Sequence, residues 1–332
     1  MRHFFSGRGK GCVLYAFLVK GERDERFVKE NSSAAFGLRK GYVFLQVFGG
    51  ERHAFFFLRE NTRDGGKDMR KWILLGLLMV VYGYGLRIVT LGPRLTEQVF
   101  ELGHGQDIVG NTIYCTRPSA AQKIQKVGNV IEINVEAIAS LKPDLILGTD
   151  LNDPKRIERL RQLGFKVVIF TQPANFEGIC REYVEIGRLL GKEKEATHRV
   201  EVLKKEVEKI AAQTAKGPRR RVFFQIGINP LWTLPDQSFM QDYLKYANAI
   251  NIATNVGYGQ ISLEQVVASD PEVILIALMD SEAKEAMAVW KNYPSLSAVK
   301  RGHVHLIDTT MATSPTPATF VAILKQIVSM TK

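Results

Sequence analysis

Two stretches of this chain, NVEAIASLKPDLIL at residues 134–147 and SLEQVVASDPEVIL at residues 262–275, match position by position although they begin 128 residues apart. In each, a Glu stands third, a Pro follows seven residues later, an acidic residue comes next, and an aliphatic run ends the stretch. Asn and Ser are preferred helix N-caps, and a Pro ends a helix and extends the residue before it. The repeat therefore predicts the same short helix and the same strand in two places.

Short aliphatic runs alternate with helical spacing on both sides of each stretch. Around the first stretch we predict strands at residues 87–92, in DIVGNT, at 145–149 and at 166–170, with helices at 95–103, from 134, and at 154–164. Around the second we predict strands at 221–227, 273–277 and 303–308, with helices at 238–248, from 262, around 282–291, and at 317–330. Such alternation is typical of parallel sheets covered on both faces. The predicted fold class is α/β, with two Rossmann-like lobes at 86–174 and 219–332.

A helical segment at residues 175–218 separates the two predicted lobes. Within it, residues 192–215 (KEKEATHRVEVLKKEVEKIAAQTA) read as one charged amphipathic helix. At a rise of about 1.5 Å per residue this helix would be about 35 Å long. We therefore expect a single long spine helix joining the lobes.

The chain has 332 residues, 45% hydrophobic and 24% charged, with a net charge of +11. Residues 1–85 carry a surplus of 7 positive charges, which leaves only 4 for the rest of the chain. No basic stripe interleaved with aromatic residues is present, and such a stripe is what nucleic-acid binders carry. Nucleic acid is therefore not an expected partner.

The stretch MRKWILLGLLMVVYGYG at residues 69–85 has the layout of a secretory signal peptide: two positive charges, a short apolar run and a small-x-small ending. It predicts export to a periplasm, with cleavage near Gly85. Residues 1–68 show no sustained period of 3.6 or 2. We expect Met69 to be the natural start and residues 1–68 to be a misassigned extension; a genuine N-terminal segment is the alternative.

Three cysteines are present, at positions 12, 115 and 180. An exported protein could pair Cys115 with Cys180, but the sequence equally allows two free thiols. No C-x-x-C motif occurs, which disfavours a cysteine-based metal or redox site.

Glu136 and Glu264 each fall in the first turn of a predicted helix, where a carboxylate favours the helix dipole. Helix stabilisation alone explains them. A first-turn Glu is also expected to be exposed, however, and one on each lobe offers two carboxylates that could dock onto basic residues of a partner.

Several stretches resemble the helical-backbone class of periplasmic substrate-binding proteins of ABC importers, which serve ferric siderophores, haem and cobalamin. They are IVTLGPRLTEQVFELG, VGNVIEINVEAIASLKPDLIL, VFFQIGINPLWTLPDQSFMQDYL and ISLEQVVASDPEVILI, and together they span essentially residues 86–332. The resemblance implies that Glu136 and Glu264 engage arginines of a permease dimer. It also implies that a monomer binds its ligand between the lobes, in loops at strand ends.

The ligand contacts that the resemblance implies are aromatic and polar residues in those loops. They are Pro93, Arg94, Tyr114, Arg117, Asn229, Trp232 and Tyr258. Aromatic rings stack on planar or greasy chelates, and Arg pairs with carboxylates or catecholates. Cobalamin-binding members have an aromatic residue where this chain has Arg117, and a Trp that GNVIEIN lacks. Both departures favour an anionic ferric siderophore, with cobalamin or haem as alternatives.

Two other classes of protein compete with this interpretation. The motif GHVHLID places His303 and His305 on one face of a strand, but two His without further ligands are weak evidence for a Zn or Mn site. No nucleophile elbow, P-loop, dinucleotide fingerprint or H-E-x-x-H motif occurs. We therefore expect a binding protein rather than an enzyme, with no cofactor and no protein-held metal.

Overall fold

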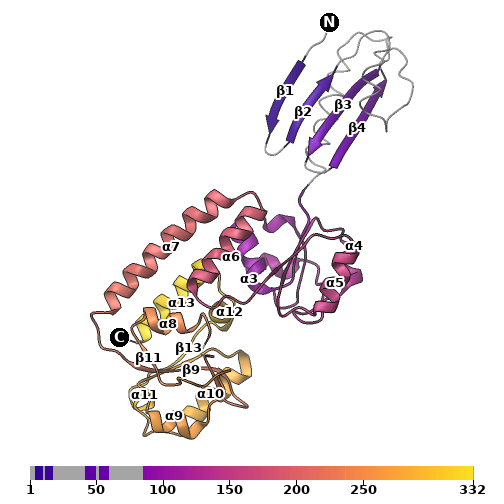
Figure 1. Cartoon of the computed structure of the whole chain (residues 1–332). Helices are drawn as coiled ribbons and strands as arrows, with labels where there is room; N and C mark the ends of the chain where they lie inside the picture. The colour runs from indigo at the N-terminus through magenta and orange to yellow at the C-terminus, as the bar shows by residue number, and fades with distance from the viewer. Residues whose placement is uncertain are drawn as a thin grey trace. The chain divides into compact units, whose positions relative to one another are not determined.

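The computed structural model describes residues 85–235 and 237–331 with their side chains, and four strands before them (Figure 1). The chain divides into two compact units, Met1–Gly85 and Leu86–Lys332. The export segment predicted at residues 69–85 lies, apart from Gly85, outside the described residues.

The first unit contains an antiparallel sheet in the order β1-β2-β3-β4. Its strands are β1 (Phe4–Gly9), β2 (Cys12–Phe17), β3 (Tyr42–Gly49) and β4 (Arg52–Arg59). The sequence of this unit has no sustained hydrophobic period, so these four strands were not predicted. They are rich in Phe, Val and Tyr, which favour strands even where apolar and polar residues do not alternate.

The second unit begins with an N-terminal lobe built on a fully parallel sheet in the order β6-β5-β7-β8. Its strands are β5 (Ile88–Thr90), β6 (Ile108–Asn111), β7 (Leu145–Thr149) and β8 (Val167–Phe170). Its helices are α3 (Pro93–Glu101), α4 (Val135–Ser140) and α5 (Pro154–Gln162), with short 3-10 turns η1 (Gly105–Asp107) and η2 (Ser119–Lys123).

The C-terminal lobe has a sheet in the order β10-β9-β12-β13, with β11 also paired to β9. Its strands are β9 (Arg221–Gly227), β10 (Trp232–Thr233), β11 (Ile250–Asn251), β12 (Val273–Ile276) and β13 (Val304–Leu306). Its helices are α8 (Gln241–Tyr246), α9 (Leu263–Ser269), α10 (Asp280–Lys291), α11 (Ser297–Lys300), α12 (Thr309–Thr313) and α13 (Pro317–Met330). The α/β class with two parallel-dominated sheets is confirmed.

Four short elements of this lobe were not predicted: β10, β11, α11 and α12. Each has two to five residues, too few to show a period. β10 also runs antiparallel to β9, so the second sheet is not purely parallel.

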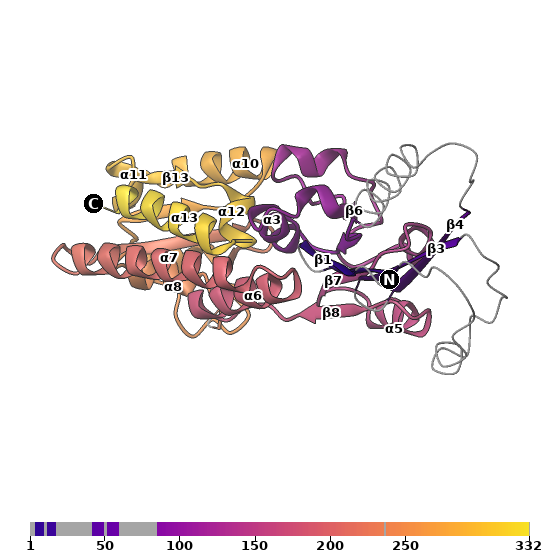
Figure 2. The same cartoon turned by 90° about the horizontal axis from the view of Figure 1, so that it is seen from above.

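Two helices connect the lobes, α6 (Phe176–Leu189) and α7 (Glu193–Thr214). The bounds of α7 lie one residue inside each end of the predicted spine helix. α7 packs along α6 and α13 (Figures 1 and 2). It buries Ala196, Val200, Val207 and Ile210, which recur at helical spacing, and leaves its Lys and Glu side chains largely to solvent. The spine is therefore a packed group of helices rather than one isolated strut.

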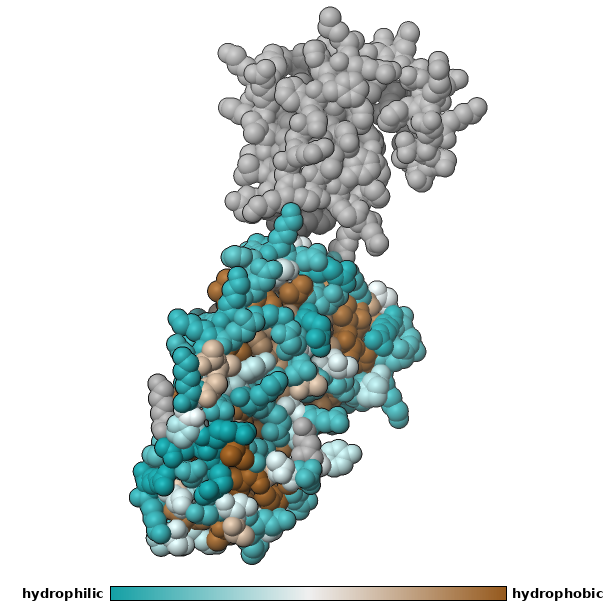
Figure 3. Space-filling model, turned by 60° about the vertical axis from the view of Figure 1, so that its left-hand side comes forward, coloured by the Kyte–Doolittle hydropathy of each residue, from teal (hydrophilic) through white to brown (hydrophobic). Residues whose placement is uncertain are grey.

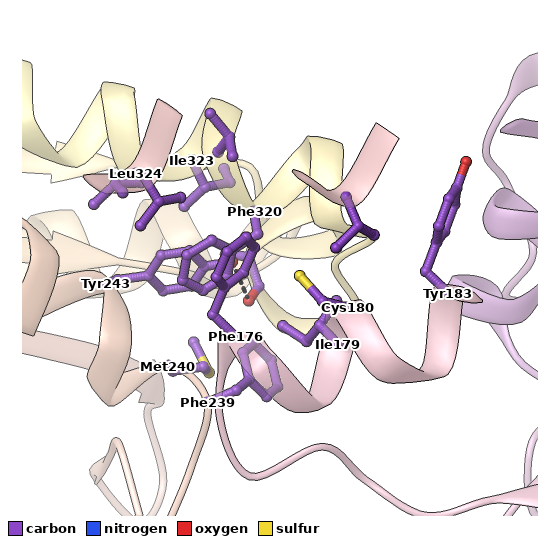
Figure 4. Close-up of a cluster of buried hydrophobic side chains, with 14 of the residues drawn as sticks. Phe176, Ile179, Cys180, Tyr183, Phe239, Met240, Tyr243, Phe320, Ile323 and Leu324 are labelled. Atoms are coloured by element: carbon purple, nitrogen blue, oxygen red, sulfur yellow. Dashed lines mark hydrogen bonds between the residues drawn. The ribbon is translucent and has the colours of Figure 1, made fainter. Parts of the chain in front are cut away.

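A stack of aromatic rings forms the centre of the core beneath the spine (Figure 4). Phe320 of α13 lies between Phe176 of α6, with ring centroids 4.5 Å apart, and Tyr243 of α8, with centroids 4.3 Å apart. All three side chains are fully buried. The largest hydrophobic cluster includes residues of both lobes and of the spine and so joins the lobes, and each lobe also has a smaller cluster of its own.

The acidic residue after each repeated Pro binds the start of the first strand in its own lobe. In the N-terminal lobe, the Arg87 backbone N–H donates to Asp144 Oδ2 (3.0 Å), and the Asp144 N–H donates to the Arg87 carbonyl (2.8 Å). The Arg87 guanidinium donates through Nε to the carbonyl of Leu141, at the end of α4 (2.8 Å). Arg87 thus ties the end of α4 to β5.

The C-terminal lobe repeats this arrangement with Arg221. Its backbone N–H donates to Glu272 Oε2 (3.1 Å), and the Glu272 N–H donates to the Arg221 carbonyl (2.8 Å). Its guanidinium donates through Nη2 to the carbonyl of Asp270, at the end of α9 (2.9 Å). The repeat therefore extends to an Arg at the start of the first strand of each lobe, directly before β5 and at the first position of β9, and this Arg holds α4 and α9 in equivalent places.

Candidate functional site

Loops that follow parallel strands converge on one edge of a sheet, where ligands of α/β proteins commonly bind. In the N-terminal lobe this carboxyl edge carries residues 91–93, 112–118, 150–153 and 171–175. In the C-terminal lobe it carries residues 228–231, 277–279 and 307–308.

An ion pair joins the two carboxyl edges. Arg117, in the loop after β6, makes an ion pair with Asp308, which directly follows β13 (Nη1–Oδ2 3.4 Å). Because one partner belongs to each lobe, the loops that resemble the ligand-binding loops of the family lie on facing sides.

Large hydrophobic side chains are exposed at both edges. Tyr114 and Leu151 in the N-terminal lobe are 54% and 60% exposed, and Met279 and Tyr258 in the C-terminal lobe are 58% and 90% exposed. Figure 3 shows hydrophobic patches in both lobes of a mostly hydrophilic face. A single exposed hydrophobic residue needs no explanation, but several on facing edges indicate a surface that a ligand covers.

Trp232 is partly buried and belongs to the same edge. It lies in β10 opposite Gly227, the last residue of β9. A Cβ on Gly227 would approach the indole Cδ1 to 2.6 Å, so glycine is what lets the ring lie over the strand. The Gly259 carbonyl accepts from the Thr233 N–H (2.7 Å), which places Tyr258 next to this edge. Asn229, in the connecting loop, is exposed.

The structure buries Arg94, one of the ligand contacts that the resemblance implied, and pairs its guanidinium with protein groups. Arg94 is 5% exposed, although Pro93 before it, the first residue of α3, is only half buried. The Arg94 guanidinium donates to both carboxylate oxygens of Glu182 on α6 (2.9–3.2 Å) and to Gln172 Oε1 (2.8 Å). Its charge therefore fastens α3 and the loop after β8 to the spine.

Arg117 is also paired with protein carboxylates. Its Nε donates to Glu97 Oε1 of α3 (3.2 Å), and its Nη1 reaches Asp308. The sequence-based preference for an anionic siderophore rested in part on Arg117 as a cation available to the ligand. Two carboxylates already balance that charge, so Arg117 does not favour an anionic ligand over a neutral one.

Glu136 and Glu264 lie in matching positions, in the first turns of α4 and α9, and both are exposed. The N-cap of each helix is another residue, Asn134 for α4 and Ser262 for α9. Asn134 Oδ1 accepts from the Ala137 N–H (2.8 Å), and Ser262 Oγ accepts from the Gln265 N–H (3.2 Å). Hydrogen bonds from its own backbone N–H and from the Ser262 hydroxyl lower the pKa of Glu264, which keeps it ionised.

The remaining candidate groups lie elsewhere. The rings of His303 and His305 stack with centroids 6.0 Å apart. Within residues 85–235 and 237–331, no group of three or more His, Cys, Asp or Glu side chains is placed to hold a metal ion. Cys115 and Cys180 are both buried and form no disulfide. No helix in the described part of the chain is long and apolar enough to cross a membrane.

Two carboxylates that the sequence did not single out, Glu97 and Glu101, lie on one face of α3. Their spacing of four residues, TEQVFE in the sequence, was the available signal. Glu101 Oε1 accepts from Thr316 Oγ1 at the start of α13 (2.6 Å), and Arg199 of α7 lies 3.5 Å from its Oε2. Burial raises the pKa of both carboxyl groups, against the opposing effects of Arg117 on Glu97 and of Thr316 on Glu101.

Replacing Glu101 by Gln should raise the stability of the protein at pH 7. A pKa that is raised in the folded state means that the protonated form is favoured there, so this group's contribution is largest at low pH and is lost as pH rises through the folded pKa. Gln mimics the protonated form and still accepts from Thr316. We expect Tm to increase by about 2–4 °C at pH 7, which corresponds to about 1 kcal/mol.

The difference in Tm between Glu101→Gln and the parent protein should shrink as pH falls towards about 4, near the ordinary pKa of Glu. Thermal unfolding between pH 4 and pH 8 measures it, with Glu201→Gln on the exposed face of α7 as the matched control. A Glu101→Gln protein less stable than the parent at pH 7 would show that the ionised form is the favoured one.

Comparison with known proteins supports the same architecture. Residues 88–310 match the family described as "Periplasmic binding protein". The chain is 30% identical over 241 residues to an uncharacterized ABC transporter substrate-binding lipoprotein, YvrC, of Bacillus subtilis (strain 168), covering 70% of this chain and 75% of that protein. It is 27% identical to the crystal structure of the periplasmic vitamin B12 binding protein BtuF of Vibrio cholerae, with a TM-score of 0.62, covering 74% of this chain and 95% of that one.

A periplasmic heme binding protein from Pseudomonas aeruginosa shares the fold, with a TM-score of 0.65 and 24% identity, over 74% of this chain and 92% of that one.

Proposed function

The chain belongs to the periplasmic binding protein family, and we propose that it captures a corrinoid between its two lobes and delivers it to the permease of an ABC importer. An extracytoplasmic location agrees with its relatives, which include a periplasmic protein and a lipoprotein. Members of this family are substrate-binding proteins of transporters, so binding rather than catalysis is the role assigned to the site.

One observation carries the choice of ligand: facing carboxyl edges expose large hydrophobic side chains, while both predicted arginines are paired with carboxylates. A large ligand with little net charge suits such a surface, because it needs apolar contact and no unpaired cation. The negative charge of a ferric siderophore would find no free cation at Arg94 or Arg117, because protein carboxylates already pair with both. The relative described as a vitamin B12 binding protein supports the same choice.

Haem is the second candidate, and Tyr258 favours it. A tyrosine phenolate is a known axial ligand of haem iron, and the side chain of Tyr258 is 90% exposed at the ligand edge. Haem binding through this residue would give a tyrosinate-type absorption spectrum that Tyr258→Phe abolishes.

A binding panel decides between these ligands. Cyanocobalamin, haem, a ferric hydroxamate and a ferric catecholate are titrated into the purified protein, with calorimetry and tryptophan fluorescence as readouts. We expect cyanocobalamin to bind at micromolar concentration or below and to change the emission of Trp232. If only the siderophores bind, the corrinoid assignment is wrong; if no chelate binds, the proposed function fails.

Tyr258→Ala should weaken ligand binding about tenfold, equivalent to about 1.4 kcal/mol, because the ring loses its stacking surface. Stability should not change, since the side chain is almost fully exposed. Calorimetric titration measures the dissociation constant. Leu163→Ala, which truncates an exposed hydrophobic residue after α5 and away from the carboxyl edge, should leave binding unchanged. Equal losses in both variants would contradict the placement of the site.

Delivery is proposed to depend on Glu136 and Glu264, one exposed carboxylate on each lobe, docking onto basic residues of a two-fold permease.

Export is proposed to depend on residues 69–85, with cleavage near Gly85 and Met69 as the natural start. Sequencing the N-terminus of the natively expressed protein tests this proposal, because a peptide from before Met69 would show that the extension is translated.

A further inference from the structure

Arg117 is the residue that joins the two carboxyl edges, and its two ion pairs differ in exposure. The Glu97 carboxylate, on α3 of its own lobe, is 11% exposed in its side chain, and Arg117 Nε lies 3.2 Å from it. The Asp308 carboxylate, on the other lobe, is 46% exposed, and Arg117 Nη1 lies 3.4 Å from it.

The two pairs should therefore break with very different ease. Separating Arg117 from Glu97 would leave a buried carboxylate without its cation, which is strongly unfavourable. Separating it from Asp308 exposes two groups that water already reaches, and exposed pairs contribute little net free energy. When the lobes move apart, Arg117 should stay on Glu97 and release Asp308.

A second contact from α3 to the C-terminal segment lies one helical turn away and is buried, unlike the partly exposed Arg117–Asp308 pair. Glu101 accepts from Thr316 Oγ1 (2.6 Å) at the buried start of α13, and α13 packs on α6 and α7. This contact is part of the spine core. The lobes are thus held firmly at Glu101 and weakly at Asp308, and a lobe motion about the firm contact opens the edge where Arg117 lies.

We propose that Arg117 is a positioning residue that acts as a latch: anchored on Glu97, it holds Asp308 and thereby sets the separation of the two edges in the ligand-free protein. Breaking the outer ion pair widens the site without unfolding either lobe. The consequence for ligand residence rests on the proposed function, whereas the lobe separation itself does not depend on it.

The test measures lobe separation without ligand. Spin labels are attached to Cys introduced at the exposed positions Lys155 on α5 and Lys284 on α10 of the full chain. Cys12 is replaced by Ser, and the two remaining native cysteines are buried. Pulsed electron paramagnetic resonance gives the distribution of distances between the labels.

The key variant is Asp308→Asn. Asn keeps the side-chain oxygen that accepts from the Met311 N–H at the start of α12, so the substitution removes only the charge.

We expect Asp308→Asn to increase the population of long distances about two- to fivefold, as loss of one partly exposed ion pair implies. Arg117→Gln should have a similar effect, and the double variant should add nothing further, because both changes remove one interaction. Arg161→Gln, which removes an exposed ion pair inside α5, should leave the distribution unchanged. If Arg117→Gln fails to fold, Asp308→Asn alone decides.

If the distance distribution of Asp308→Asn is identical to that of the parent protein, Arg117 does not set the lobe separation and the proposal is wrong. If cyanocobalamin binds the parent, its dissociation from Asp308→Asn should be two- to fivefold faster. If no chelate binds, the proposed ligand fails, and the distance distributions still decide whether Arg117 holds the lobes.

Discussion

Replacing Glu136 and Glu264 together by Ala should abolish ligand uptake by cells while leaving ligand affinity unchanged. Both carboxylates are exposed on short helices that matching arginines hold against the first strand of each lobe. Asn134 and Ser262 are the N-caps of these helices, so removal of the two exposed Glu side chains should alter stability by at most about 1 kcal/mol. The expected loss of transport is at least about a hundredfold, because a charged contact made once on each lobe is lost at both ends of the interface.

Uptake of radiolabelled cyanocobalamin, or of whichever chelate the panel identifies, measures the effect in cells that depend on this protein. The matched control is Glu158→Ala with Glu285→Ala, which removes one exposed Glu from each lobe on α5 and α10 instead. It should transport normally. A double variant of Glu136 and Glu264 that loses ligand affinity would place these residues in the ligand site, and one that transports normally would leave them as helix-stabilising residues only.

Replacing Phe320 by Ala should cost about 3–5 kcal/mol of folding stability. Its ring is fully buried between Phe176 and Tyr243 (Figure 4), so the truncation removes two stacked contacts and leaves a cavity where α6, α8 and α13 meet. We expect Tm to fall by on the order of 10 °C. Thermal and denaturant unfolding measure the change.

Two further variants separate the loss of aromatic stacking from other causes. Phe320→Leu, which fills most of the cavity, should cost only about 1–2 kcal/mol. Tyr258→Ala removes an exposed aromatic ring and should leave Tm unchanged. If Phe320→Ala unfolds the C-terminal lobe alone and leaves the N-terminal lobe folded, the shared core does not couple the lobes.

The two repeated stretches show which structural features a local sequence pattern predicts and which it does not. The N-caps, the first-turn acids and the strand after each Pro are visible in the sequence because residues within one turn determine them. The partner of the acid after each Pro was not predicted. That partner is the backbone of Arg87 in one lobe and of Arg221 in the other, more than 50 residues earlier in the chain. An Arg at the start of the first strand of each lobe was the visible signal, but nothing local says what it binds.

The predicted site residues divide in the same way. Tyr114, Asn229 and Tyr258 are exposed at the carboxyl edges because parallel strands bring the loops that follow them to one edge. Arg94 and Arg117 carry charge in loops of the same kind, and the sequence gives no reason to treat them differently from the aromatic residues. Their partners Glu182 and Asp308 lie 88 and 191 residues away, and these contacts pair both arginines with protein carboxylates.

The sequence by itself determined the α/β class, the two lobes, the long helix between them and the matched pair of glutamates. Each depends on periodicity, capping or strand alternation, which act over a few residues. The tertiary structure alone decided which charges remain available, that the two thiols stay apart, and that one hydrophobic cluster joins both lobes to the spine. These properties depend on which distant groups meet, since burial and pairing set the free energy of a charge far more than its neighbours in the chain do.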